Sequence, residues 1–287
     1  MPALNVVNLY DIMPERFKEG VSADDTSALL EKVGRYSYQT MKKIIPAIDF
    51  DYDWGLWLDS EATVVQPFSL REMFDEYVQR PTVWRSRMAK NDIMRGFMGN
   101  ATRVLGRSAD SWGPMFWNLD SVQWIVEKAV VTDMIAYVEN AHGTDFWTAW
   151  IANDGPFEVN MYNLHIQARK LETVDSIFSK YLVLETEREL VRFGMAPAFP
   201  HVEAHGDTGF LERAYRLLKS NELQPNFSAF MRHYKQRLFR FEGLEFAPPE
   251  VIDRFLLDSP VNLLVCGSPP LHEWWQKRID DGKMVVT

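Results

Sequence analysis

The chain has 287 residues and a mass of 33.4 kDa, with 46% hydrophobic and 25% charged residues. This is the composition of an ordinary globular protein, and it excludes fully disordered and collagen-like chains. The net charge of −9 argues against non-specific binding to nucleic acid or anionic lipid, because both require a basic surface. The single cysteine, Cys266, excludes an intramolecular disulfide, and neither a membrane-spanning apolar run nor a secretory signal is present. We therefore expect a cytoplasmic protein without a transmembrane segment.

Short apolar runs predict strands, and longer stretches with helical periodicity predict helices. The strands are expected at Leu4–Leu9, Trp54–Leu58, Thr63–Val65, Thr82–Trp84, Met115–Leu119, Tyr181–Leu184 and Val261–Val265. The helices are expected at Tyr36–Ile48, 70–78, 121–142, Asp145–Asn153, Phe157–Lys170 and over most of 208–242. Strands alternate with helices through the first 200 residues, which favours an α/β fold with a largely parallel sheet. We expect one domain over residues 1–206 and a mainly helical C-terminal extension, residues 207–287, packed on it.

Several predicted elements carry signals at their ends. Ser69 followed by Glu72 is a capping box at the start of the helix that runs to Val78. Pro46 is expected to end or kink the helix over Tyr36–Ile48. The run Trp54–Leu58 is expected to be a strand buried on both faces of the sheet.

Two carboxylates, Asp59 and Glu61, directly follow this apolar run. In open α/β sheets, ligands bind beyond the carboxyl ends of the strands. A carboxylate pair there can hold one Mg²⁺ or Mn²⁺ ion, which takes its other ligands from water and substrate phosphates. The alternative interpretation is a polar turn that ends a strand, since this short pattern often occurs by chance.

Three motifs in order resemble those of GT-A glycosyltransferases. WGLWLDSEATVVQPF (54–68) resembles the DxD region of that family, with Glu61 in place of the second aspartate. GRYSYQTMKK (34–43) is similar to the G-W-x-x-Q-Q-x-x-K stretch of uncharacterised bacterial glycosyltransferase-like proteins, and PFEVNMYNLHI (156–166) is similar to their S-E-Y motif. The resemblance implies a Rossmann-like GT-A domain with a mainly parallel sheet and flanking helices. Because only 58 residues precede Asp59, it also implies a shortened N-terminal nucleotide-binding part.

The resemblance implies a metal-dependent transfer of a sugar from a nucleotide-sugar donor, with a UDP-sugar favoured, to a carbohydrate or other hydroxyl acceptor. Asp59 and Glu61 would hold Mn²⁺ or Mg²⁺, which neutralises charge on the leaving diphosphate. A late histidine is often a further ligand in this family, and His205, with His201 four residues before it, is the candidate here. Gln39 and Lys42 would approach the diphosphate or the donor sugar.

Other residues would serve the acceptor and the chemistry. Trp117 and Asn118 occupy an acceptor-side position, where an aromatic ring and an amide suit a sugar. Glu158 is the candidate base that takes the proton of the acceptor hydroxyl, with Asp154 as a second candidate, and an inverting reaction is favoured. Trp147 and Trp150 are candidates for the wall of the acceptor cleft.

Each candidate also has a structural interpretation. Lys42 and Lys43 suit a solvated helix face, Glu158 suits the positive end of a helix dipole, and Asp154 suits a helix N-cap. Core packing is the alternative for Trp117 and the favoured interpretation for His165, and loop exposure is the alternative for His201 and His205. At the level of function, the alternatives are a non-catalytic glycosyltransferase-like module for carbohydrate binding or assembly, and a metal-dependent phosphoester hydrolase. The donor sugar, the acceptor and the oligomeric state stay open.

Overall fold

The computed structural model describes residues 5–25, 27–60, 62–85, 92–113, 124–172, 177–194, 223–240, 253, 256–265 and 269–283. The chain forms two compact units that alternate along the sequence. The first unit comprises Met1–Gly55, Arg95–Gly113 and Val126–Phe178. The second unit comprises Leu56–Met94, Pro114–Ile125 and Ser179–Thr287.

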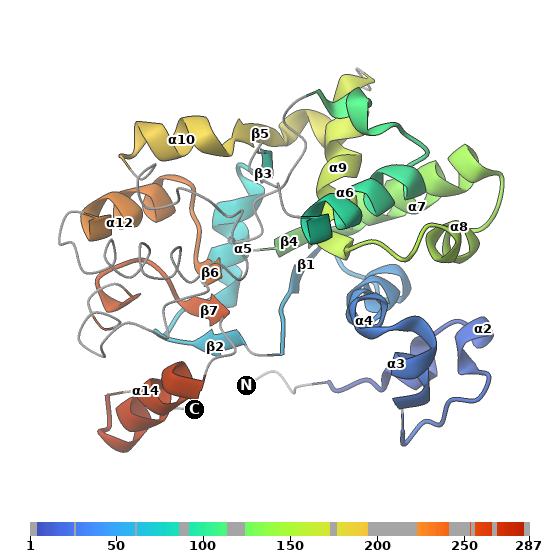
Figure 1. The fold of residues 1–287 in the computed structure, drawn as a ribbon. Coiled ribbons are helices and arrows are strands. Elements are labelled where there is room, and N and C mark those ends of the chain that lie inside the picture. Colours follow the sequence, from blue (N-terminus) through green and yellow to red (C-terminus); the bar gives the residue numbers. More distant parts are fainter. Residues whose placement is uncertain are drawn as a thin grey trace. The chain divides into compact units, whose positions relative to one another are not determined.

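The first unit is built from helices (Figure 1). They are α1 (Leu9–Ile12), α2 (Glu15–Lys18), α3 (Ser27–Val33), α4 (Arg35–Asp49), most of α6 (Asp92–Val104), the 3₁₀ helix η1 (Ala109–Trp112), α7 (Lys128–His142), α8 (Phe146–Ala152) and α9 (Glu158–Leu171). Helix α9 is central to this unit, because α4 and α7 both pack against it and most of its 14 residues are buried. The 3₁₀ helix η2 (Ile177–Lys180) follows, and its Phe178 is also buried.

The second unit carries the remaining helices and two small sheets. Strand β3 (Thr82–Arg85) pairs in parallel with β5 (Leu182–Glu185). In the other sheet, β7 (Leu263–Val265) lies between β2 (Ala62–Val64), which is antiparallel to it, and β6 (Leu238–Arg240), which is parallel to it. The helices described in this unit are α5 (Leu70–Val78), α10 (Thr186–Arg192), α12 (Leu223–His233) and α14 (Pro269–Asp280).

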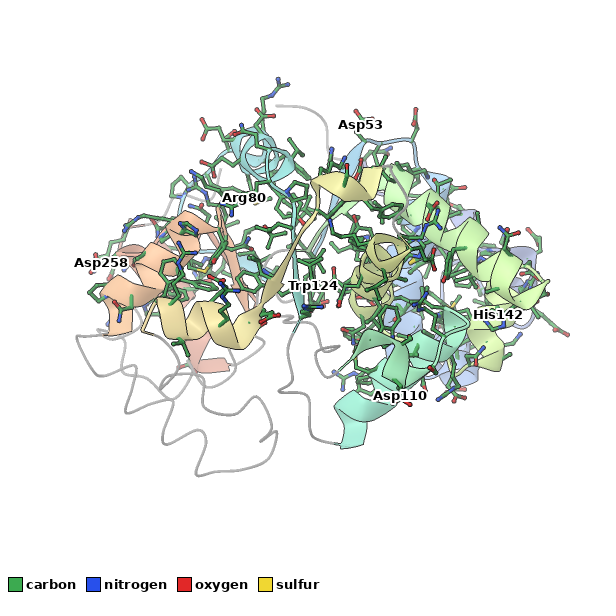
Figure 2. The ribbon with its side chains drawn as sticks, turned by 90° about the horizontal axis from the view of Figure 1, so that it is seen from above. Asp53, Arg80, Asp110, Trp124, His142 and Asp258 are labelled. Atoms are coloured by element: carbon green, nitrogen blue, oxygen red, sulfur yellow. The ribbon has the colours of Figure 1, made fainter. Side chains whose placement is uncertain are left out.

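A third strand pair contains two of the five points at which the chain changes units. Strand β1 (Trp54–Trp57) pairs with β4 (Trp124–Glu127). Trp124 begins β4, and Asp53, whose carbonyl accepts the backbone N–H of Lys128 at 2.9 Å, precedes β1 (Figure 2). Because the described residues combine helices with parallel and antiparallel strand pairs, the chain is α/β, as predicted.

The predicted single, mainly parallel sheet differs from what the described residues form. Their strands make three separate sheets of two or three strands, and one sheet contains an antiparallel pair. A parallel sheet is covered on both faces and needs strands that are buried throughout. In β1 only Trp57 is buried, and all four residues of β5 are half-buried, so these strands lack the burial that a broad parallel sheet requires.

Many of the predicted elements are confirmed. The structure contains β1, β2, β3, β5 and β7 and the helices α4, α5, α8 and α9 at or within a few residues of their predicted positions. Ser69 caps α5 by accepting the N–H of Glu72 at 3.3 Å, and Gly143 ends α7 in the left-handed conformation, with a φ of 62°. The predicted strand at Met115–Leu119 lies outside the described residues, and so does the predicted domain boundary at residue 206.

Two local predictions are wrong, and a third is narrowed. Residues 5–8 form no strand, because Val6 is 82% exposed and the Asn8 side chain instead caps α1. Trp124–Glu127 forms a buried strand rather than the start of α7, because it pairs with β1. Pro46 lies inside α4, which continues to Asp49, so of its two predicted effects the end of the helix is excluded and the kink stays a prediction. Among the described residues, no helix is both long and apolar enough to cross a membrane.

Candidate functional site

The acidic turn after β1 is the first part of the candidate site. Strand β1 ends at Trp57, and the carbonyl of Asp59 accepts the N–H of Ala62 at 3.0 Å, so that β2 begins three residues later. The Asp59 side chain is half-buried. Glu61 lies outside the described residues. Asp59 thus lies two residues beyond the end of β1, close to its predicted position, and its pairing with Glu61 around a cation stays a prediction.

The other candidate ligands for metal and acceptor also fall outside the described part of the chain. These residues are Trp117, Asn118, His201 and His205. Within the residues that are described, no three histidine, cysteine, aspartate or glutamate side chains gather as a metal cluster. Asp59 belongs to the second unit, whereas Gln39, Lys42, Asp154 and Glu158 belong to the first.

Glu158, the candidate base, begins α9 and is fully buried. Thr40 Oγ1 donates to its Oε2 at 2.9 Å, and Lys43 Nζ donates to its Oε1 at 2.6 Å. The Lys43 side chain is only 10% exposed. A buried carboxylate is tolerated when a cation and hydrogen bonds compensate it, and here both come from α4. The geometry makes Glu158 a bridge between α4 and α9, and its role as a base stays a prediction.

Sequence reasoning selected Lys42 for the donor and missed Lys43 as the partner of Glu158. Lys42 is exposed, and its Nζ lies 5.2 Å from the centre of the Tyr38 ring. Lys43 follows Thr40 by three residues, the spacing that places two side chains on one helix face, and it precedes the buried Ile44. This spacing was the available signal. Gln39 is half-buried on the same helix.

Asp154 occupies a strained turn rather than a helix cap. Its φ is 61° and that of Gly155 is 48°, so two successive residues adopt the left-handed conformation. The N-cap of α9 is Phe157, which makes no side-chain cap, and the predicted capping role of Asp154 is therefore wrong. The Asp154 side chain is 79% exposed and lies 3.7 Å from Arg103 Nη2.

Trp147 and Trp150 are core residues and do not line an open cleft. Both are buried, and their rings meet edge to face with centroids 5.4 Å apart. Trp147 also meets Phe17 at 5.4 Å and Phe146 at 5.1 Å. The aromatic side chains hold α8 against α2, so the proposed acceptor wall is wrong for these two residues.

His165 is buried, as its core interpretation predicted, but it is also part of a charged network. Its Nε2 lies 2.7 Å from Asp133 Oδ2 on α7. Arg169 donates to Asp133 Oδ1 at 3.1 Å and to Glu172 Oε2 at 3.0 Å. Arg107 and Tyr137 both donate to Glu172 Oε1 at 2.9 Å. The network ties α7 to α9, and only the fold brings its members together.

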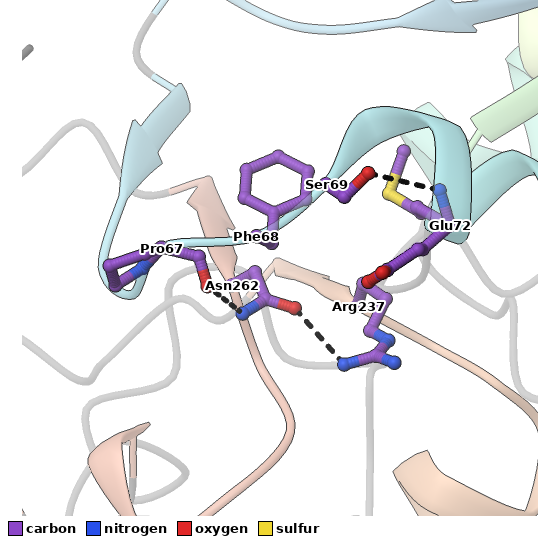
Figure 3. Close-up of a pocket in the computed structure, with 7 residues that line it drawn as sticks. Pro67, Phe68, Ser69, Glu72, Arg237 and Asn262 are labelled. Carbon is purple, nitrogen blue, oxygen red and sulfur yellow. Dashed lines mark hydrogen bonds between the residues drawn. The ribbon is translucent and has the colours of Figure 1, made fainter.

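A small polar pocket lies at the start of α5 in the second unit (Figure 3). It is lined by Pro67, Phe68, Ser69, Glu72, Met73, Arg237 and Asn262. Asn262 donates to the Pro67 carbonyl and accepts from Arg237 Nη1, each at 3.4 Å. The volume of the pocket is about 100 Å³, whereas pockets for ligands of drug size measure about 300–1,000 Å³. This pocket is too small for a nucleotide sugar.

Comparison with known proteins adds no relative. No family model matches the chain, and no curated protein or solved structure is significantly similar to it. Among the predicted metal ligands, Asp59 is the one that lies in the described part of the chain, where it is half-buried shortly after β1.

Proposed function

We propose that the chain is a metal-dependent glycosyltransferase that moves a sugar from a nucleotide-sugar donor to a hydroxyl acceptor. The observation that carries the proposal is the position of Asp59, half-buried two residues after β1 and at the start of a tight turn into β2. This position supports an interpretation of the sequence 59–61 as a DxD-like metal motif. The proposal includes the GT-A-like fold that the three sequence motifs imply.

The donor set suits a hard divalent cation. Carboxylate oxygens are the ligands that Mg²⁺ and Mn²⁺ prefer, and a half-buried aspartate has its charge only partly screened by water. Asp59 and Glu61 would hold the ion, with His205 as a further ligand. When bound, the ion would neutralise charge that develops on the departing diphosphate. Gln39 and Lys42 would bind the donor, and Trp117 and Asn118 the acceptor sugar.

A second candidate is a non-catalytic glycosyltransferase-like module that binds carbohydrate or takes part in an assembly. One observation favours it. Both carboxylate oxygens of Glu158 already accept hydrogen bonds from α4, and the side chain is fully buried. A general base must reach the acceptor hydroxyl, directly or through one water. In the catalytic proposal, substrate binding must therefore release Glu158 from Lys43, or Asp154 must serve as the base.

Calorimetry tests the metal and donor site. The full chain is titrated with a panel of UDP-sugars in the presence of Mn²⁺ and, separately, of EDTA. The proposal predicts binding heat that depends on Mn²⁺ for at least one UDP-sugar. Asp59→Asn should remove it, because one anionic ligand is lost, whereas Asp51→Asn, an exposed carboxylate before β1, should preserve it. Absence of heat for every donor would contradict the proposal.

A turnover assay separates the two candidates. The chain is incubated with Mn²⁺ and the UDP-sugar that binds, and release of UDP is followed with and without a panel of simple sugar acceptors. The enzyme proposal predicts UDP release that Asp59→Asn abolishes. Binding of the donor without any release of UDP favours the non-catalytic module.

A further inference from the structure

His165 lies in the interior of the first unit with one of its two ring nitrogens unused. The side chain is 0% exposed, and its ring meets the edges of Tyr137 at 5.1 Å and Phe178 at 5.6 Å. Nε2 is 2.7 Å from Asp133 Oδ2. Nδ1 is buried and has no hydrogen-bond partner among the described residues. The neutral ring with its proton on Nε2 fits this environment, since it donates to Asp133 and leaves no N–H without an acceptor.

Charged groups and one neutral titratable hydroxyl, that of Tyr137, surround this ring on several elements. They are Asp133 and Tyr137 on α7, Arg169 on α9, Glu172 directly after α9, and Arg107 after α6, whereas η2 contributes the uncharged ring of Phe178. Asp133 is shared, because Arg169 donates to its Oδ1 at 3.1 Å and has Nε 2.9 Å from its Oδ2. The carboxylate is thus already balanced by a permanent cation.

A second proton on His165 conflicts with this arrangement in two ways. It would create an Nδ1–H in the interior without an acceptor, and a buried unsatisfied donor costs about 1–3 kcal/mol. It would also place a positive charge near the Arg169 guanidinium. Burial lowers the pKa of His165 from its ordinary value of 6.5, although the hydrogen bond and charge of Asp133 act in the opposite direction.

We propose that His165 is an acid-sensitive latch between α7 and α9. When the ring takes up a second proton, it leaves its buried position, and the C-terminal half of α9 separates from α7. Asp133 on α7 and Arg169 on α9 separate in the same step and become hydrated, so no buried carboxylate is left uncompensated. Opening becomes more frequent as the pH falls below 6.5, where an exposed histidine is protonated. Asp133 and Glu172 remain ionised in this range, because hydrogen bonds and neighbouring cations outweigh burial and lower the pKa of each.

Amide hydrogen exchange tests the latch on the full chain at pH 7.5 and pH 5.5, with rates corrected for the intrinsic pH dependence of exchange. At pH 5.5 a free histidine is about 10:1 protonated, so opening of α9 should be up to about tenfold more frequent than at pH 7.5. Peptides from residues 158–171 and 128–142 should report it. Peptides from the second unit should not change.

Matched variants isolate the histidine. His165→Gln keeps an N–H that reaches Asp133 but does not titrate, so its α9 peptides should exchange equally at both pH values. His272→Gln, an exposed histidine on α14, should behave as the wild type. An equal acid response in His165→Gln and wild type would overturn the latch. So would an NMR titration of the wild-type His165 ring with a pKa at or above 6.5 while α9 stays protected, a measurement that decides the question even if the variant does not fold.

Discussion

Lys43 Nζ lies 2.6 Å from Glu158 Oε1, and this contact joins the middle of α4 to the first residue of α9 across 115 positions of sequence. The Glu158 side chain is fully buried and that of Lys43 is 10% exposed. Removal of one member of such a pair leaves a buried charge without compensation, which costs far more than the pair contributes when intact. The contact is therefore a sensitive point for the first unit.

Lys43→Met should destabilise the protein by about 3–5 kcal/mol, because Glu158 then loses the cation that balances its carboxylate. The measurement is urea denaturation followed by tryptophan fluorescence. The double variant Lys43→Met/Glu158→Gln should recover part of the loss, since an amide needs no counterion and still accepts the hydrogen bond from Thr40. A double variant whose loss equals the sum of the two single losses would show that the two residues are not coupled.

Gly155→Ala should destabilise the first unit through both strain and overpacking. Gly155 has a φ of 48°, and an added Cβ would lie 2.7 Å from Trp150 Cζ2 and 2.8 Å from Ser37 Oγ. Left-handed backbone costs about 1–2 kcal/mol for a residue with a Cβ, and overpacking adds about 1–3 kcal/mol. Gly20→Ala is the matched control, because its φ is 75° but nothing lies within 4 Å. The free energy of unfolding should be highest for the wild type, lower for Gly20→Ala and lowest for Gly155→Ala. An equal loss of stability in the two variants would contradict the packing argument.

Acid stability should depend on Asp133 in a range distinct from that of the latch. Burial alone would raise the pKa of Asp133, but the hydrogen bond from His165 and the charge and hydrogen bond of Arg169 lower it from its ordinary value of 3.8. A carboxyl whose folded pKa is depressed contributes stability above its unfolded pKa and loses it as the pH falls through the folded value. The stability difference between wild type and Asp133→Asn should consequently shrink as the pH falls from about 5 to below 3. Urea midpoints at several pH values measure it, with the exposed Asp24→Asn as baseline. A difference that does not change with pH would argue against this assignment.

Replacing Arg237 with lysine should destabilise the second unit, because Arg237 makes a two-point contact with Glu76. Arg237 donates from Nε at 3.2 Å and from Nη2 at 3.0 and 3.1 Å to the two carboxylate oxygens. Lysine cannot reproduce this fork, so Arg237→Lys should cost about 1 kcal/mol, a value reduced because both side chains are about 30% exposed.

Arg85→Lys provides the comparison for that prediction. Within the described part of the chain, Arg85 makes one hydrogen bond, from Nη2 to Glu185 at 3.1 Å, and its exposure of 34% is similar. A lysine can make a single contact of this kind, so the loss should stay below about 0.5 kcal/mol. Equal losses in thermal denaturation for the two variants would show that the two-point contact carries no special stability.

The local elements of the chain were largely predictable because short-range interactions determine them. The α5 cap uses Ser69 and Glu72, three residues apart, and the left-handed Gly143 ends α7 by a bond to Glu139 four residues before it. Asp59 was correctly placed after a strand for the same reason. The prediction was wrong at Trp124–Glu127. The sequence pattern predicted a helix there, but these residues form a strand because they pair with β1, 70 positions earlier in the chain.

The sequence by itself determined the class of fold, most helices, the position of Asp59 shortly after β1 and the burial of His165. Only the tertiary structure decided which charges meet: Lys43 with Glu158, and His165 with Asp133 and Arg169. Hydrophobic periodicity and helix caps involve residues within about one helical turn of each other, so both can be recognised from neighbouring residues in the sequence. Ion pairs between helices depend on how two apolar faces pack. The sequence therefore does not indicate which of its distant charged residues will form a pair.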